Sequence, residues 1–135
     1  MSVQYLVDTN VVSELMRPRP DARVAAWLAS QARFALSAIS VDESVFGLVR
    51  KERNTLLAGY ERFVAERCLV LPITDDIARR AGTLRGQFAR RGIARSQPDM
   101  LIAATAQAHN LTLVTRNTRD FESCGIGLLN PFEHP

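Results

Sequence analysis

Four carboxylates stand where the sequence predicts strand ends and helix starts. They are Asp8, Glu43, Asp99 and Asp120. In a parallel α/β sheet such points lie on one rim, so the four negative charges would crowd together. Like charges that close repel strongly unless protons or cations neutralise them. We therefore expect a divalent cation held by carboxylate oxygens, with Mg²⁺ as the first choice and Mn²⁺ as a substitute.

Each acid also has an ordinary structural explanation. Asp8 suits the cap of the helix that follows it, and Glu43 completes a capping box that starts at Ser40. Asp99 opens a predicted helix, where a negative charge offsets the macrodipole, and Asp120 suits the cap of a short turn. No single one of these acids implies a metal by itself. The metal prediction therefore depends on the four side chains lying close together in the fold.

An arginine-rich stretch points to a polyanionic substrate. Between residues 77 and 98 there are six arginines and no acid, in a chain whose net charge is +3. Such a stretch can hold a phosphate backbone without reading base sequence, although a solvated helix face is the plainer alternative. A carboxylate-held metal suits phosphoryl chemistry, because it activates water and shields the developing charge. The candidates for contact with the phosphate backbone are Arg79, Arg80, Arg85, Arg90, Arg91 and Arg95.

Apolar runs separated by amphipathic segments predict alternating strands and helices. The predicted strands cover residues 3–7, 34–39, 68–73, 111–115 and 126–129. Predicted helices begin at the caps Asn10, Asp21, Ser40 and Thr74 and cover about 54–67 and 99–109 as well, with a helical turn over 119–124. Strands separated by helices imply a parallel sheet with helices on both faces. We expect an α/β fold of four to five parallel strands, in one domain over residues 1–135.

Several classes of protein are disfavoured. No stretch approaches the roughly 18 to 20 apolar residues needed to cross a bilayer, so we expect no membrane association. The first eight residues lack the basic segment of a secretory signal, so we expect a cytoplasmic protein. Cys68 and Cys124 are far apart, and His109 and His134 are isolated, which argues against zinc and against a disulfide framework.

Four segments of the chain carry a family resemblance: residues 6–15 (LVDTNVVSEL), 36–43 (LSAISVDE), 98–106 (PDMLIAATA) and 113–121 (LVTRNTRDF). Together they resemble the PIN-domain ribonucleases, and within them the VapC toxins and similar FitB proteins of bacterial toxin–antitoxin pairs. The resemblance runs in order over nearly the whole chain and implies a single PIN-like domain. Two departures are Ser44, where an apolar residue is more usual, and the extra acid Asp42, which we expect to face away from the metal.

The resemblance also implies roles for individual residues. Asp8, Glu43, Asp99 and Asp120 would form the catalytic acidic quartet around Mg²⁺ or Mn²⁺. Asp8 and Asp99 would ligate the metal directly, and Glu43 and Asp120 would bind it directly or through water. Thr9 and Asn117 would have a supporting role, orienting the site or its waters.

The implied activity is cleavage of RNA, often tRNA or rRNA, at internal phosphodiester bonds by metal-activated water. The resemblance further implies a homodimer and inhibition by a cognate antitoxin protein, with operator DNA contacted only through that antitoxin. Apolar helical segments around Trp27, Leu28, Leu57 and Tyr60 are candidates for an antitoxin groove, although a place in the core is the default for each.

Two other classes of protein, one enzymatic and one signalling, need residues that this chain does not have at the required positions. A haloacid-dehalogenase-like phosphatase needs a second aspartate two positions after Asp8, where Asn10 stands. A receiver domain needs an acidic pair after the first strand and a lysine near the last, but the one lysine is Lys51. Two alternatives remain open: a housekeeping PIN nuclease without an antitoxin, and a non-catalytic module of the same fold that binds RNA or protein.

Overall fold

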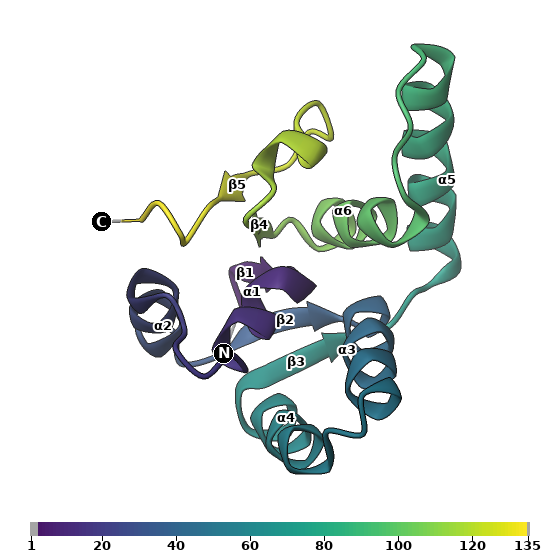
Figure 1. The fold of residues 1–135 in the computed structure, drawn as a ribbon. Helices are drawn as coiled ribbons and strands as arrows, with labels where there is room; N and C mark the ends of the chain where they lie inside the picture. Colours follow the sequence, from purple (N-terminus) through teal and green to yellow (C-terminus); the bar gives the residue numbers. More distant parts are fainter. Residues whose placement is uncertain (1–2, 135) are drawn as a thin grey trace.

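The computed structural model describes residues 3–134 and contains a five-stranded parallel sheet (Figure 1). The strands are β1 (Tyr5–Val7), β2 (Phe34–Ser37), β3 (Cys68–Leu71), β4 (Thr112–Val114) and β5 (Leu128–Leu129), in the spatial order β3-β2-β1-β4-β5. Every neighbouring pair is parallel. The predicted α/β class and parallel sheet are therefore confirmed, with strands somewhat shorter than the sequence indicated.

Six α-helices and one short 3₁₀ helix connect these strands. They are α1 (Thr9–Leu15), α2 (Ala22–Ala29), α3 (Ala38–Arg50), α4 (Asn54–Arg67), α5 (Asp75–Arg90), α6 (Gln97–His109) and η1 (Thr118–Phe121). In Figure 1, α5 packs against α6 and projects beyond the sheet. Within residues 3–134, no helix is both long enough and apolar enough to span a membrane.

The order of the strands fixes where a ligand crevice can form. From β1 the chain winds outward through β2 to β3, then crosses to the opposite side of β1 and winds outward through β4 to β5. The winding direction therefore reverses between β1 and β4. In parallel sheets ligands bind beyond the carboxyl ends of the strands at such a reversal.

Adjacent residues of β1 point into two separate cores, which explains the uninterrupted apolar run. Leu6 packs into a cluster with the buried faces of α5 and α6, and Val7 packs into a second cluster with α1, α2 and α4. Both side chains are fully buried. A strand covered by helices on both faces is apolar throughout rather than alternating. The predicted two-sided covering is therefore correct.

Two predicted helix caps are wrong, and both corrections affect the acids. Asp8, not Asn10, caps α1, because its Oδ1 accepts a hydrogen bond of 2.7 Å from the Thr9 backbone. Ser37, not Ser40, caps α3, and its Oγ accepts a 3.2 Å hydrogen bond from the Ile39 backbone. The predicted box from Ser40 fails because the helix starts directly at the end of β2, three residues earlier than expected.

The remaining two predicted caps agree with the structure. Asp21 and Thr74 cap α2 and α5 as expected. Trp27 and Leu28 are buried in the core, which agrees with the default interpretation of these two candidates.

Candidate active site

An open cavity lies beyond β1 and β4, where the winding direction reverses. Its volume is about 510 Å³, and we call it the acid cavity. Its lining consists of Asp8, Thr9, Asn10, Ser13, Glu14, Arg17, Glu43, Asp99, Arg116 and Asn117. Five of these were nominated from the sequence, including three of the four predicted carboxylates. The fold thus collects on one surface acids that are up to 91 positions apart in the chain, as Asp8 and Asp99 are.

Asp8 is the most buried of these acids. It is 5% exposed, and its two oxygens accept hydrogen bonds from the Thr9 backbone at 2.7 Å and from Thr115 Oγ1 at 2.8 Å. Burial raises the pKa of Asp8 to about 6, although both hydrogen bonds act to lower it. The negative charges of Asp99 and Glu43 raise this pKa further. Burial therefore outweighs the hydrogen bonds in setting the pKa of Asp8.

Glu43 reaches the acid cavity from α3. It lies in the second turn of that helix, so it has no part in capping it. Thr9 Oγ1 donates a hydrogen bond of 3.0 Å to Glu43 Oε1, which links the first residue of α1 to α3. The neighbouring Asp42 is exposed and is not among the residues that line the cavity. Adjacent positions on a helix point about 100° apart, which explains the difference.

Asp99 and Asp120 are electrostatically coupled. Asp99 lies in the first turn of α6, behind the cap Ser96, and its pKa is raised chiefly by burial. The charge of Asp120 raises it further, whereas the Ser96 hydrogen bond and the charge of Arg95 lower it. Asp120 lies in η1 and does not line the acid cavity. The fourth predicted acid is thus close enough to Asp99 to raise its pKa, but it lies outside the lining of the cavity that the other three share.

The donor chemistry of this site suits a hard divalent cation. Its charged ligand candidates are carboxylate oxygens, which Mg²⁺ and Mn²⁺ prefer. Among residues 3–134, however, no three Asp, Glu, His or Cys side chains stand close enough together to hold a metal ion as they lie. The side chains would have to draw closer around an ion, and the raised pKa values of Asp8 and Asp99 indicate that their charges are poorly compensated without one.

Several residues of the site were missed at the sequence level, among them Thr115, Glu14 and Arg116. Thr115 is fully buried and joins Asp8 to Asn117, whose backbone donates to Thr115 Oγ1 at 3.1 Å. Glu14 is a buried acid whose Oε2 accepts a 2.8 Å hydrogen bond from the Asp21 backbone. Arg116 is exposed at the edge of the cavity. A polar residue directly after a buried strand was an available signal for Thr115, since Asp8 occupies the same place after β1.

The arginine-rich stretch divides into groups with different partners. Arg79 and Arg80 form ion pairs of 2.9 Å with the acids one turn earlier in α5, Asp75 and Asp76. Arg91 and Arg95 both lie over one buried ring, with guanidinium carbons 5.0 and 4.9 Å from the centroid of Phe88. The remaining two, Arg85 and Arg90, are exposed on α5. Of the six, Arg95 is the one whose charge reaches Asp99.

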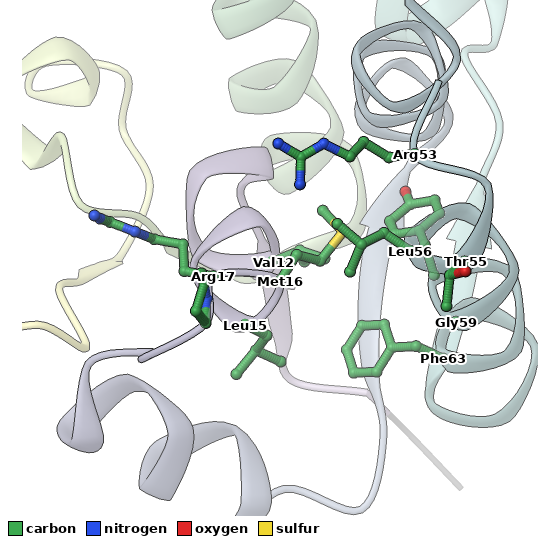
Figure 2. A pocket seen from close by; sticks show the side chains of 11 residues that line it. Val12, Leu15, Met16, Arg17, Arg53, Thr55, Leu56, Gly59 and Phe63 are labelled. Atoms are coloured by element: carbon green, nitrogen blue, oxygen red, sulfur yellow. The ribbon is translucent and has the colours of Figure 1, made fainter. Parts of the chain in front are cut away.

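A second cavity, which we call the apolar cavity, lies between the end of α1 and α4. Its volume is about 630 Å³. Figure 2 shows Val12 and Met16 on one side and Leu56 and Phe63 on the other, with Gly59 leaving space in the α4 wall. Tyr60, which was expected in a groove, also lines it. Arg17 lines both cavities, so the apolar and acidic surfaces meet at this residue.

The similarity of this chain to known protein sequences points to one family. The family model described as PIN domain matches residues 5–125. The VapC ribonuclease Y4jK of Sinorhizobium fredii is 36% identical, with 95% of this chain and 97% of that protein covered. The toxin FitB of Neisseria gonorrhoeae is 35% identical, with 94% of this chain and 97% of FitB covered.

Solved structures with the same architecture cover nearly the full length of both chains. The crystal structure of FitAcB from Neisseria gonorrhoeae gives a TM-score of 0.85 at 35% identity, covering 97% of this chain and 100% of that one. A toxin-antitoxin complex from Klebsiella pneumoniae gives a TM-score of 0.75 at 30% identity, covering 97% of this chain and 100% of that one.

Proposed function

The chain belongs to the PIN-domain family, and from that premise we propose that it is an endoribonuclease and the toxin of a toxin–antitoxin pair. The observation that carries the proposal is the placement of Asp8, Glu43 and Asp99 around one cavity at the reversal of the sheet. Relatives that cover nearly all of the chain are named as a ribonuclease and a toxin. We take residues 1–135 as one PIN domain that acts in the cytoplasm.

Mg²⁺, or Mn²⁺ in its place, is the proposed cofactor. Asp8 and Asp99 would ligate it directly, and Glu43 and Asp120 would bind it directly or through water. When bound, such an ion neutralises negative charge at a phosphate and makes a water molecule more acidic. The proposal is supported by the oxygen donors at the site and by the raised pKa of Asp8 and Asp99.

Neighbouring hydroxyl groups hold the carboxylates in their orientation. Thr115 donates to Asp8, and Thr9 donates to Glu43. Asn10 also contributes, because its Nδ2 donates to Asp8 Oδ2 at 3.3 Å. Partners of this kind fix the direction of ligand oxygens, and their loss usually weakens metal binding or activity. Thr9 therefore fits the supporting role, and Asn117 acts through its backbone bond to Thr115.

The apolar cavity is the proposed docking site of the antitoxin. It offers apolar side chains from two helices and continues at Arg17 into the acid cavity. An amphipathic segment of a partner can bury its apolar side chains in such a groove. An arginine of the same segment would find carboxylates in the acid cavity and could displace the metal. Antitoxin binding at both cavities would thereby block access of RNA to the acids.

Homodimerisation is proposed through the outer face of α3. Phe46 and Val49 are 64% and 57% exposed there, which is unusual for large apolar side chains. The acid Asp42 lies toward the start of this face, and Arg50 lies toward its end. When two copies pair about a two-fold axis perpendicular to α3, this helix runs antiparallel to its equivalent, so each acidic end meets a basic end with the apolar residues between them.

Incubation of the purified protein with single-stranded RNA, tRNA and rRNA tests the activity. We expect cleavage with Mg²⁺, none with EDTA, and none by Asp8→Asn or Asp99→Asn. Asp42→Asn is the matched control, because it removes a neighbouring exposed carboxylate that does not line the acid cavity. Cleavage that persists in EDTA or in both site variants contradicts the proposal. RNA binding without any cleavage would favour the non-catalytic module instead.

The role as a toxin is tested separately. We expect a short reading frame beside this gene to encode a small DNA-binding protein that forms a complex with the chain and suppresses cleavage. An active nuclease without such a neighbour would favour a housekeeping PIN nuclease.

A further inference from the structure

Arg116 is an exposed residue whose backbone is nevertheless fixed on both sides. Its amide donates a hydrogen bond of 3.3 Å to Asn10 Oδ1, and its carbonyl accepts one of 3.2 Å from Asn130 Nδ2. Asn10 also contacts Asp8, so the position of Arg116 is tied to the most buried acid of the site. An exposed loop residue held at both peptide groups has little conformational freedom to lose when it binds a ligand.

The side chain of Arg116 is held as well. Its guanidinium carbon lies 4.5 Å from the centroid of Phe132, the shortest such contact among residues 3–134. Phe132 is itself 8% exposed and therefore provides a rigid surface. Stacking on one face of the guanidinium leaves its N–H groups, which lie in the plane, available to an acceptor.

The charge of Arg116 is not used within the fold. None of the ion pairs formed by residues 3–134 includes Arg116, whereas Arg17, the other arginine of the acid cavity, pairs with Glu14 at 3.4 Å. Arg116 lines the same cavity as four carboxylates and lies over a ring rather than in an ion pair with any of them. An exposed guanidinium that forms no ion pair with these residues is suited to bind the negatively charged group of a ligand.

We propose that Arg116 binds a phosphate of the RNA backbone adjacent to the phosphodiester at the acids, a role that the sequence had suggested for the six arginines between residues 77 and 98. The inference rests on the proposed nuclease function and names the residue that positions its substrate. Phosphate oxygens match the paired N–H donors of guanidinium. Arg79 and Arg80 are weaker candidates for this role, because each is already paired with an acid on its own helix.

Binding of a fluorescein-labelled single-stranded RNA of mixed sequence, followed by fluorescence anisotropy, tests the proposal. Every protein would carry Asp99→Asn, so that RNA is bound but not cut. Arg116→Gln is compared with Arg119→Gln, a matched loss of one exposed arginine that lies three residues later, in η1, and does not line the acid cavity. The dissociation constant is measured at several salt concentrations, and thermal melting checks that each variant is folded.

We expect Arg116→Gln to weaken RNA binding by about fivefold or more and to lower the slope of log Kd against log salt by about 1, as the loss of one phosphate contact does. Arg119→Gln should leave the dissociation constant and the salt slope close to those of the parent protein. Arg116→Lys should keep the salt slope but bind more weakly, since an ammonium does not form the paired hydrogen bonds. Equal binding by the Arg116→Gln and Arg119→Gln proteins, or no RNA binding by any of them, overturns the proposal. Failure of the nuclease function would instead appear as absent cleavage by the wild-type chain.

Discussion

Thr115 Oγ1 donates a hydrogen bond of 2.8 Å to Asp8 Oδ2 across 107 positions of the chain. The two residues follow directly on β4 and β1, the strands between which the winding direction reverses. Asp8 also caps α1, so the same carboxylate joins two strand ends and one helix start. The capping role and the proposed metal role of Asp8 are compatible, because Oδ2 accepts from Thr115 and Asn10, whereas Oδ1 accepts from Thr9 and keeps a second lone pair for a cation.

Thr115→Val removes this hydrogen bond at nearly constant volume. We expect metal affinity or RNA cleavage to fall by about 10- to 100-fold, as is typical when a partner of a metal ligand is lost. The hydrogen bond from Thr115 lowers the pKa of Asp8, so the variant should also need a higher pH for metal binding. Cleavage rates and metal titrations at several pH values measure both effects. Thr115→Ser, which keeps the hydroxyl, should behave like the wild type; equal losses in both variants would contradict the interpretation.

Asp8→Asn should stabilise the metal-free protein at neutral pH. The pKa of Asp8 is 3.8 in its ordinary state and about 6 when folded. Between these values the folded state holds more protons than the unfolded state, so its stability falls as pH rises through this window. A shift of about two units corresponds to about 3 kcal/mol from this group alone. Asparagine escapes this loss but donates where Asp8 accepts, so we expect a net gain of about 1–2 kcal/mol.

Urea unfolding in EDTA measures this prediction at two pH values. The stability of Asp8→Asn minus that of the wild type should be positive at pH near 7.5 and should fall by roughly 3 kcal/mol, to below zero, at pH near 4, where the folded carboxyl is protonated and only the mismatched hydrogen bonds of asparagine remain. A variant that is inactive yet more stable cannot owe its inactivity to unfolding. If Asp8→Asn is less stable than the wild type at neutral pH, the raised pKa of Asp8 is not the dominant effect at this position.

The sequence predicted the acids better than their local structural roles. Asp8 was found because it directly follows an apolar strand and Asp99 because it opens a predicted helix, and both lie in the segments that resemble the PIN family. Their common cavity depends on the sheet order, which follows from packing between distant elements. Glu43 illustrates the limit. Its assignment to a capping box followed the local spacing from Ser40, but α3 starts at the end of β2 and leaves Glu43 free to reach Thr9.

Contacts over long sequence distances were beyond local patterns. Nothing near Arg116 in the sequence indicates that Phe132 lies under its guanidinium. The net charge of the arginine-rich stretch was overestimated for a local reason. The count between residues 77 and 98 omitted Asp75 and Asp76, which lie just before it. Those two acids pair with Arg79 and Arg80 and reduce the charge available to a phosphate backbone.

Addition of Mg²⁺ or Mn²⁺ should stabilise the wild-type protein by about 2.7 kcal/mol at a metal concentration 100 times the dissociation constant. The ion favours ionised carboxylates, so apparent affinity should fall as pH drops through about 6, where Asp8 takes up a proton. Thermal melting with metal and with EDTA measures the change, and calorimetry gives the affinity. Asp99→Asn should lose most of the stabilisation, whereas Asp42→Asn should keep it. A gain of the same size in both variants would indicate binding elsewhere.

Gly59→Leu should prevent antitoxin binding while leaving the fold and the nuclease intact. A Cβ at Gly59 meets its nearest atom, Arg62 Nη2, at 3.9 Å, so the larger side chain has room to enter the apolar cavity. Leucine also favours helix over glycine by up to about 1 kcal/mol. Co-purification with the small protein encoded beside this gene measures binding. Ala58→Leu is the control, because Ala58 is exposed on the same helix and does not line the cavity. Normal binding by Gly59→Leu would place the antitoxin elsewhere.

Phe46→Asp should convert a dimer of this chain into monomers, because it places two new charges at the centre of the proposed α3 contact. Light scattering after size-exclusion chromatography measures the mass, and Ala89→Asp, on the exposed face of α5, is the control. A charge exchange tests the antiparallel arrangement further. Asp42→Arg should weaken the dimer by facing Arg50 of the second copy, and addition of Arg50→Asp should restore it, because the complementary ends are then reversed rather than lost. A wild-type monomer, or a Phe46→Asp protein that remains dimeric, would exclude this face as the contact. Failure of the exchange alone would retain the face but reject the antiparallel pairing of Asp42 with Arg50.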